Sequence, residues 1–350
     1  MERQDYNMAF MLQYENVAWY ENGKVRILDR RIYPTEIKFV ECYSYTEVAK
    51  AIADMVTQSA GPYTAAGMGM ALAAYECRDL VMEEQKKFLE KAGSTIANAR
   101  PTTANRMKKV TDGCLEAARL AFLSGDNVVE AIFNRTLDSL NRRYSTMSIV
   151  GKNLVSLFPK NGTILTQCFG ETIIGTMLRE CQEQNNDIKL ICSETRPYLQ
   201  GARLTSSCGA DMGFDTTVIT DNMVAYAMQN EGIDIFTSAA DTIARDGHIA
   251  NKIGSFQIAI LAKYFGIPYF VTGIPDEDKH FGKDIIIEKR DPSLVLKYRG
   301  IPNTLPDVKA IYPSFDVVPP HLISGIVTDK EIYTPYNLNE YFKGKVKEFY

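Results

Sequence analysis

The sequence has little histidine, and its cysteines are not spaced to hold a metal. Its 350 residues include only three histidines and seven cysteines, and no two cysteines form a C-x-x-C pair. A structural zinc site needs four closely spaced Cys or His ligands, so no metal is expected. Scattered thiols, odd in number, fit a reducing compartment, and a cytoplasmic location is therefore expected.

Long apolar runs and an excess of basic residues are also missing. No stretch approaches the roughly 18 apolar residues of a membrane span, and the first residues contain no apolar run typical of a signal peptide. Lys and Arg number 39 against 43 Asp and Glu, which gives a formal net charge of −4. Because a nucleic-acid surface usually needs a basic patch, we expect neither nucleic acid nor membrane as a partner.

The G-x-G-x-x-G fingerprint of dinucleotide-binding proteins is absent as well. That motif follows the first strand of a parallel sheet. After the first such strand predicted here, Thr163–Thr166, this chain instead reads Gln167–Cys168–Phe169–Gly170. The absence argues against an NAD enzyme, and no cofactor is expected.

What is present is the composition of a globular protein with a sizeable core, 45% hydrophobic and 23% charged. At this length two domains are expected. Residues 1–150 are predicted to form a mostly helical domain, with a small β-hairpin turning at Asn22–Gly23. Residues 151–350 alternate short apolar runs with helical segments, which is typical of βαβ units. The predicted fold class is α/β, in which a Rossmann-like parallel sheet flanked by helices follows the helical domain.

Strands of that sheet are predicted at five places, and helices of the first domain at four. The strands are Thr163–Thr166, Ile188–Cys192, Thr217–Thr220, Ile233–Phe236 and Tyr269–Val271. The helices are 44–56, opened by a capping box at Ser44 and Glu47, then 70–75, 83–92 and 127–158.

Two segments of the first domain could bind an anion. The small, glycine-rich stretch Ser59–Gly69 is expected to form a loop before a helix, where backbone N–H groups can bind phosphate. Tight helix packing explains the same small residues at least as well. Pro101 is expected at a first helical position, which puts the guanidinium of Arg100 beside a helix start.

Cys168 and Asp241 are the candidates for chemistry. Each lies just past the carboxyl end of a predicted strand. Parallel strands all end at one edge, so both side chains can face one crevice. A thiol near a helix N-terminus can have a lowered pKa and act as base or nucleophile. A carboxyl that donates a proton must be shielded, which Ile235 and Ile253 could do. Alternatively, Asp241 is a helix cap and Cys168 a buried apolar residue.

Motifs from about Trp19 to Thr328 resemble those of the methylthioribose-1-phosphate isomerases. Their superfamily also holds the regulatory subunits of translation initiation factor 2B. Thr195–Thr205 is similar, almost letter for letter, to T-R-P-x-x-Q-G-A-R-L-T, and Ala240–Gly254 to A-D-x-I…G-x-x-A-N-K-x-G. Further similarities are Thr220–Met223 to T-D-N-M, Ala99–Thr102 to S-R-P-T, and Pro313, Phe315, Asp316 and Pro319 to N-P-x-F-D-x-T-P.

This resemblance implies a reaction and a set of site residues. The reaction would convert 5-methylthioribose 1-phosphate or 5-deoxyribose 1-phosphate to the ribulose 1-phosphate, in salvage of 5′-methylthioadenosine or 5′-deoxyadenosine products. A homodimer without metal or cofactor is implied. Cys168 and Asp241 would be catalytic, and the substrate would be bound by Gln200, Asn251, Lys252, Arg100, Gly61 and Tyr63.

The chain departs from the family in the glycine-rich stretch. The family reads R-G-A-P-A-I-G there, and its arginine helps to bind the phosphate, whereas residues 59–67 contain no arginine. The change bears on which sugar is used, and Tyr63 could narrow the pocket for the smaller 5-deoxy sugar. The alternative function is a non-catalytic regulatory subunit of the initiation factor 2B type, binding a sugar phosphate or a nucleotide.

Overall fold

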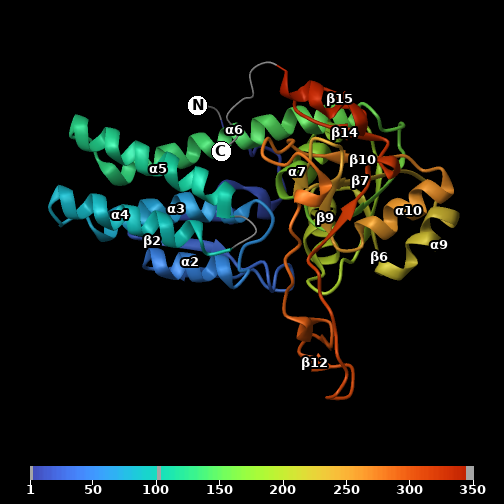
Figure 1. Ribbon diagram of the computed structural model, residues 1–350, viewed down its shortest axis with the longest axis horizontal. Coiled ribbons are helices and arrows are strands. Elements are labelled where there is room, and N and C mark those ends of the chain that lie inside the picture. Colours follow the sequence, from blue (N-terminus) through green and yellow to red (C-terminus); the bar gives the residue numbers. More distant parts are fainter. Residues whose placement is uncertain (1–2, 101–103, 344–350) are drawn as a thin grey trace. The chain divides into compact units, whose positions relative to one another are not determined.

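The computed structural model describes residues 3–100 and 104–343, which divide into two compact units (Figure 1). The first unit ends at Thr146 and the second begins at Met147. We propose that the two units correspond to the helical domain 1–150 and the Rossmann-like domain 151–350.

The first unit combines a small antiparallel sheet with long helices. The predicted hairpin is confirmed, because Asn22 and Gly23 adopt the left-handed φ of 49° and 78° that a tight turn requires. A third strand, which was not predicted, pairs with the second one. The strands are β1 (Ala18–Glu21), β2 (Lys24–Leu28) and β3 (Phe39–Cys42), and the main helices are α2 (Tyr45–Ala53), α3 (Gly61–Glu76), α4 (Met82–Ala97), α5 (Ala104–Ser124) and α6 (Val128–Val155).

Side-chain caps fix the starts of two of these helices. The Ser44 hydroxyl accepts a hydrogen bond from the N–H of Glu47 at 3.3 Å, as the predicted capping box requires. The Asn127 side-chain oxygen accepts from the N–H groups of Val129 and Glu130 at 3.0 and 3.2 Å. Each cap satisfies amides that would otherwise have no partner within the helix.

The glycine-rich stretch is mostly helix, so the prediction of a loop over Ser59–Gly69 is wrong. Helix α3 already begins at Gly61, because Pro62 in its first turn needs no hydrogen-bond acceptor. The small residues serve packing, since a Cβ on Gly67 would lie 2.5 Å from the Thr136 side chain. The predicted helical position of Pro101 lies outside the described residues.

The second unit is built on a mostly parallel sheet, as predicted (Figure 1). The sheet has seven strands, two more than were predicted. All five predicted strands are present, although β6 begins and ends earlier than expected. The strands are β4 (Thr163–Gln167), β5 (Lys189–Ser193), β6 (Asp215–Ile219), β7 (Ile233–Ala239), β10 (Tyr269–Thr272), β14 (Gly325–Val327) and the antiparallel β15 (Ile332–Tyr333).

The order of these strands indicates where the sheet is expected to bind a ligand. From one edge to the other the order is β15-β14-β10-β7-β4-β5-β6. The chain starts at β4, moves outward to β6, and then returns to β7 and moves outward on the other side. Such a reversal is a topological switch point, and open α/β sheets bind their ligands just beyond the strand ends at that point. Here it lies between β4 and β7.

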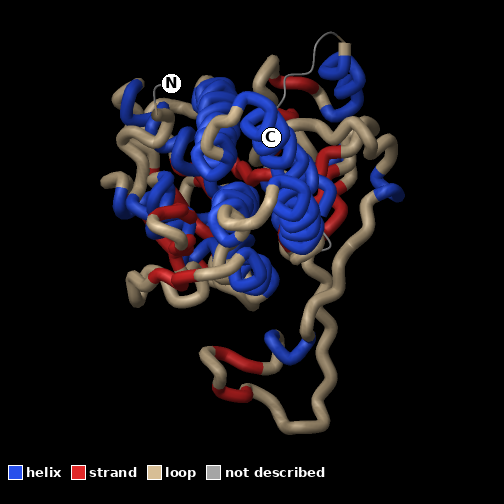
Figure 2. The backbone as a smooth tube through the Cα atoms, turned by 90° about the vertical axis from the view of Figure 1, so that its left-hand side faces the viewer, coloured by secondary structure: helices blue, strands red, loops and turns tan. Residues whose placement is uncertain are grey.

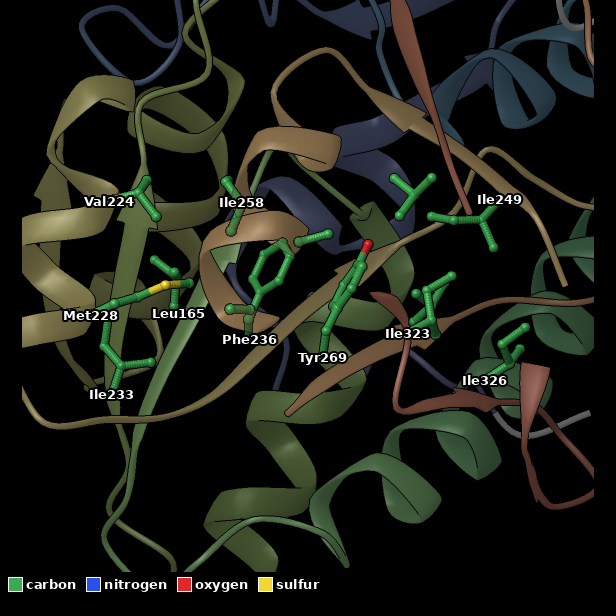
Figure 3. Close-up of a cluster of buried hydrophobic side chains, with 14 of the residues drawn as sticks. Leu165, Val224, Met228, Ile233, Phe236, Ile249, Ile258, Tyr269, Ile323 and Ile326 are labelled. Carbon is green, nitrogen blue, oxygen red and sulfur yellow. The ribbon is translucent and has the colours of Figure 1, made fainter. Parts of the chain in front are cut away.

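Apolar side chains of the sheet pack with those of neighbouring segments in one buried cluster (Figure 3). The rings of Phe236 and Tyr269, on neighbouring strands, stack at 4.3 Å between centroids. Leu165 and Ile258 are fully buried in the same cluster. Burying a side chain of this size stabilises the fold by roughly 1.5–3 kcal/mol. The helices of this unit are α7 (Glu171–Glu183), α8 (Ser206–Asp211), α9 (Val224–Asn230) and α10 (Ser255–Phe265).

Two smaller sheets complete the second unit. One joins β8 (Thr242–Ile243), β9 (Ile249–Lys252) and β13 (Phe315–Val318). The other is a hairpin of β11 (Lys297–Tyr298) and β12 (Ile301–Pro302), carried on an arm that extends away from the large sheet (Figure 2). Within the described ranges, no helix is both long and apolar enough to cross a bilayer.

Candidate active site

Cys168 and Asp241 both lie at the switch point of the large sheet. Cys168 directly follows β4, and Asp241 comes two residues after β7. The two strands are parallel neighbours, with Thr166 opposite Thr237. The structure therefore brings the two side chains to one edge of the sheet, as the strand pattern predicted.

The Cys168 thiol is buried and held by its neighbours. Its Sγ donates a weak hydrogen bond to Gln200 Oε1 at 3.5 Å, and its backbone N–H donates to Thr195 Oγ1 at 2.8 Å. Its carbonyl accepts a hydrogen bond from the Thr205 hydroxyl. Cys168 has a left-handed φ of 58°, which is strained for a residue with a side chain. These contacts fix the direction in which the sulfur points.

Burial raises the pKa of the Cys168 thiol to about 11. Asp241 raises it further, whereas the positive charges of Lys252 and Arg290 lower it without offsetting the burial. The expectation of a lowered pKa from the start of α7 is therefore wrong. Taking a thiolate out of water costs more than the nearby positive charges return. At neutral pH Cys168 is a protonated thiol.

Asp241 is exposed, which corrects the expectation that apolar neighbours shield it. Its backbone N–H donates to the carbonyl of Ala250 at 2.8 Å, which ties the segment after β7 to β9. Ile235 is 3% exposed and lies inside β7, within the sheet, while Ile253 is only half-buried. Neither residue therefore shields the exposed side chain of Asp241 from water.

Gln200 reaches Cys168 because an aspartate just after the end of β6 holds its segment. The carboxylate of Asp221 accepts hydrogen bonds from the N–H groups of Thr195 and Arg196, at 2.8 and 2.7 Å, and from the hydroxyl of Ser193. Asp221 belongs to the T-D-N-M motif that follows β6. The motif therefore fixes the strand end from which the Gln200 segment starts.

The close approach at Gly201 also explains why that position is a glycine. A Cβ there would lie 1.8 Å from the carbonyl oxygen of Ser193. No side chain fits, so the backbone can return to the end of β5 only at a glycine. The turn that follows, Gly201–Thr205, is a short π-helix.

Asn251 and Lys252 are placed by the pairing of β9 with β13, where Asn251 faces Asp316 and Lys252 faces Phe315. Both side chains are buried, at 3% and 5% exposure. The Asn251 amide donates to Ser238 Oγ at 2.8 Å. The Lys252 ammonium lies 4.7 Å from the centroid of the Phe315 ring. The positive charge of Lys252 acts on the Cys168 thiol, and Asn251 precedes Lys252 on the same strand.

Asp316 organises the backbone that follows Lys252. Its carboxylate accepts from the N–H groups of Gly254 at 2.8 Å and Phe256 at 3.0 Å. Gly254 has a φ of 103°, which favours glycine. A carboxylate at this point caps α10, although it comes from a distant segment.

The other three predicted substrate residues, Gly61, Tyr63 and Arg100, belong to the first unit. Gly61 and Tyr63 are buried, and their N–H groups donate to the carbonyls of Gln58 and Ala60 at 3.2 and 3.1 Å. Those amides are engaged by their own turn. Arg100 is half-buried and follows α4. Substrate binding by these three residues stays a prediction.

A cluster of one cation and two tyrosines, which no sequence motif predicted, lies near the thiol. The Arg290 guanidinium lies 5.5 Å from the centroid of the Tyr198 ring, which in turn lies 6.2 Å from the ring of Tyr312. Tyr312 is 4% exposed, and its hydroxyl finds no hydrogen-bond partner among the described residues. A bridge between Lys289 and Pro313 aligns the two distant segments. No spacing in the sequence indicates that bridge.

The described residues contain no group of three His, Cys, Asp or Glu side chains that could hold a metal ion. All seven cysteines are buried, and no disulfide joins any of these described residues.

Known proteins share the fold and are similar in sequence over most of the chain. The chain is 35% identical over 333 residues to the methylthioribose-1-phosphate isomerase of Bacillus pumilus, covering 91% of this chain and 93% of that protein. Its structure matches the 5-methylthioribose 1-phosphate isomerase of Pyrococcus horikoshii with a TM-score of 0.81 and 31% identity, over 93% and 95% of the two chains. It matches the translation initiation factor eIF-2B subunit delta from A. fulgidus equally well, with a TM-score of 0.81 and 29% identity over 94% and 99%.

These relatives agree with the motifs quoted from the sequence. The Initiation factor 2 subunit family matches residues 59–335, which is most of the chain. That range contains the switch point with Cys168 and Asp241. This protein belongs to the Initiation factor 2 subunit family.

Proposed function

We propose that this protein is an aldose–ketose isomerase that converts a 5-substituted ribose 1-phosphate to the corresponding ribulose 1-phosphate. The observation that carries the proposal is the pairing of Cys168 and Asp241 at the switch point. Gln200 accepts a hydrogen bond from the thiol, and the charge of Lys252 acts on it. The isomerase relatives, at 31–35% identity over almost the whole chain, support it.

In this proposal Asp241 and Cys168 divide the chemistry. Asp241 donates a proton to the ring oxygen, and the bond from that oxygen to C1 breaks as the sugar opens. The hydrogen on C2 then moves to C1, assisted by Cys168, and the C2 hydroxyl returns a proton to Asp241 as the ketone forms. Nothing is oxidised or reduced overall. Because the buried Cys168 thiol stays protonated at neutral pH, it does not remove the C2 hydrogen as a base. It instead gives the path from C2 to C1 an apolar lining.

The favoured substrate is methylthioribose 1-phosphate, because relatives at 35% identity are named for it. The alternative, 5-deoxyribose 1-phosphate, is supported by the missing arginine in the segment that carries the buried Tyr63. The two sugars differ only at C5, so one protein can be tested with both. A homodimer is part of the same proposal.

Substitution of the proposed pair tests the mechanism. Cys168→Ala and Asp241→Asn should each lower kcat by at least about 10³-fold while leaving the circular dichroism spectrum and the midpoint of thermal unfolding nearly unchanged. Cys181→Ala, which removes another buried thiol of the same unit, is the matched control and should keep most of the activity. Full activity of either site variant would remove that residue from the mechanism.

A second candidate is a non-catalytic subunit that acts by contacting other translation factors. It is favoured by the equally close match to the A. fulgidus eIF-2B subunit delta structure. A binding subunit does not require a buried thiol and a carboxylate at one switch point. Specific capture of translation factors by the purified protein, together with inert sugar phosphate assays, would favour this function instead.

A further inference from the structure

Two covered oxygen atoms of the second unit have no hydrogen-bond partner among the described residues. One is the hydroxyl of Tyr312, a side chain that is 4% exposed. The other is Oε2 of Glu288, whose Oε1 lies 3.6 Å from Nε of Arg290. A polar atom that is hidden from water and has no partner is unfavourable, so each of them calls for an explanation. A polar ligand would satisfy both atoms.

Both side chains lie on one face of a short antiparallel ribbon. The N–H of Arg290 donates to the carbonyl of Tyr312 at 2.9 Å, on one side of the bridge described above. The N–H of Ser314 donates to the carbonyl of Glu288 at 2.9 Å, on its other side. Residues that are opposite each other or two positions apart point to the same side of such a ribbon. Tyr312 and Glu288 are therefore diagonal neighbours on one face.

Tyr198 links this face to the Cys168 thiol. Its ring lies 6.2 Å from the ring of Tyr312. Two residues further along the chain, Gln200 accepts the hydrogen bond of the thiol at 3.5 Å. Burial raises the pKa of the Tyr312 hydroxyl, Arg290 lowers it in part, and Cys168 raises it further. Tyr312 is therefore protonated at neutral pH and can donate a hydrogen bond beside the thiol.

Tyr312 is also a position at which the chain departs from its family. The motif N-P-x-F-D-x-T-P has asparagine directly before its first proline, whereas Tyr312 precedes Pro313 here. Packing does not explain the hydroxyl, because phenylalanine would fill almost the same volume without a buried polar atom. The hydroxyl therefore points to binding.

We propose that Tyr312 and Glu288 bind the 3-hydroxyl group of the substrate sugar, with Tyr312 as the donor and Glu288 as the acceptor. This inference rests on the proposed function. The ring oxygen and the C2 hydroxyl take part in that reaction, and the 5-substituent carries no hydroxyl, so the 3-hydroxyl is the sugar hydroxyl without a role in the chemistry. A hydroxyl both accepts and donates, so one group satisfies both atoms. A site built in this way rejects a sugar that lacks the hydroxyl.

The test compares the sugar phosphate that the protein turns over with its 3-deoxy analogue. The full-length variants are Tyr312→Phe and Glu288→Gln, and kcat/KM is measured for both compounds, together with urea denaturation. The matched control is Tyr341→Phe, which removes another buried tyrosine hydroxyl of the same unit, one that donates to Asp329 at 2.9 Å. If the wild type isomerises neither sugar, Kd for the same compounds from isothermal titration calorimetry replaces kcat/KM.

Tyr312→Phe should lower kcat/KM for the 3-hydroxy sugar about 10-fold, mainly through KM, and should not lower the stability of the free protein. Glu288→Gln replaces a charged acceptor by a neutral one of the same size and should lower kcat/KM about 3-fold. On the 3-deoxy analogue both variants should match the wild type within about 2-fold. Tyr341→Phe should do the opposite, losing stability and keeping kcat/KM.

Equal losses on the sugar and on its 3-deoxy analogue would overturn the proposal. So would wild-type kcat/KM in Tyr312→Phe, or a loss of stability in that variant, which would show that the hydroxyl has a structural partner. Binding of the 3-hydroxy sugar that depends on Tyr312, in a protein that isomerises neither sugar, would keep the site and reject the proposed function. A wild-type protein that binds neither sugar would overturn both.

Discussion

Removal of the Asp221 carboxylate should reduce stability and activity together, although Asp221 is not a proposed catalytic residue. Its oxygens accept from the N–H groups of Thr195 and Arg196 and from the hydroxyl of Ser193. The Thr195 hydroxyl in turn accepts from the N–H of Cys168. Thr195 and Cys168 both have left-handed φ values, 63° and 58°, which persist only because their surroundings hold them.

The expected cost follows from these contacts. A hydrogen bond to a charged group contributes roughly 1.5–3 kcal/mol when buried. Asp221 is only half-buried, so water replaces part of each lost bond in the Asp221→Ala variant. A loss of about 3 kcal/mol in the free energy of unfolding is therefore expected. Relaxation of Thr195 would also shift the sulfur of Cys168, and a misplacement of about 1 Å can lower the rate about 10²-fold.

The assay combines urea denaturation with the measurement of kcat/KM. The matched control is Asp215→Ala, an exposed aspartate at the start of β6, the strand that leads to Asp221. The control should stay within about 0.5 kcal/mol of wild type. The account of Asp221 is refuted if Asp221→Ala matches its control in both the free energy of unfolding and kcat/KM.

Two further substitutions and one pH series follow from buried polar groups. Tyr312→Phe removes a buried hydroxyl that has no described partner and should raise the free energy of unfolding by about 1 kcal/mol. Tyr269→Phe removes a hydroxyl that is hydrogen-bonded to Ser238 Oγ at 2.7 Å and should lower the free energy of unfolding by about 1 kcal/mol. Equal shifts of the two variants in urea denaturation would contradict both assignments. Because burial raises the pKa of Cys168 to about 11, the unfolded chain loses that proton first as pH rises above about 8.5. The free energy of unfolding should therefore fall by roughly 1 kcal/mol per pH unit between pH 9 and 10 because of this thiol. Cys168→Ala should show a slope shallower by that amount, and parallel slopes would mean that the thiol titrates as in water.

Much of the fold could be predicted because its signals are local. The Asn22–Gly23 turn, the capping residue Ser44 and the apolar runs of the sheet each act over a few residues. The switch point followed from strand direction alone. The start of α3 was misjudged because glycine and alanine favour a loop in isolation, whereas Pro62 and close contact with Thr136 favour a helix in the folded unit.

The electrostatics of the site were harder to predict, because they depend on burial. Proximity to α7 suggested a lowered pKa for Cys168, but burial of the sulfur outweighs every nearby positive charge. Asp241 was expected to be shielded because Ile235 is close to it in sequence. Alternation along β7 instead directs the Ile235 side chain to a buried face of the sheet. Arg290 reaches the vicinity of the thiol through a bridge between Lys289 and Pro313, which no local pattern encodes.

The central claim is that this protein isomerises a ribose 1-phosphate. The most direct measurement incubates the purified full-length protein with methylthioribose 1-phosphate and, separately, with 5-deoxyribose 1-phosphate, and follows the anomeric proton by NMR. The account predicts loss of that signal and appearance of the ribulose 1-phosphate, with kcat/KM higher for one of the two sugars. Folded protein that leaves both sugars unchanged would contradict the claim and favour a binding subunit.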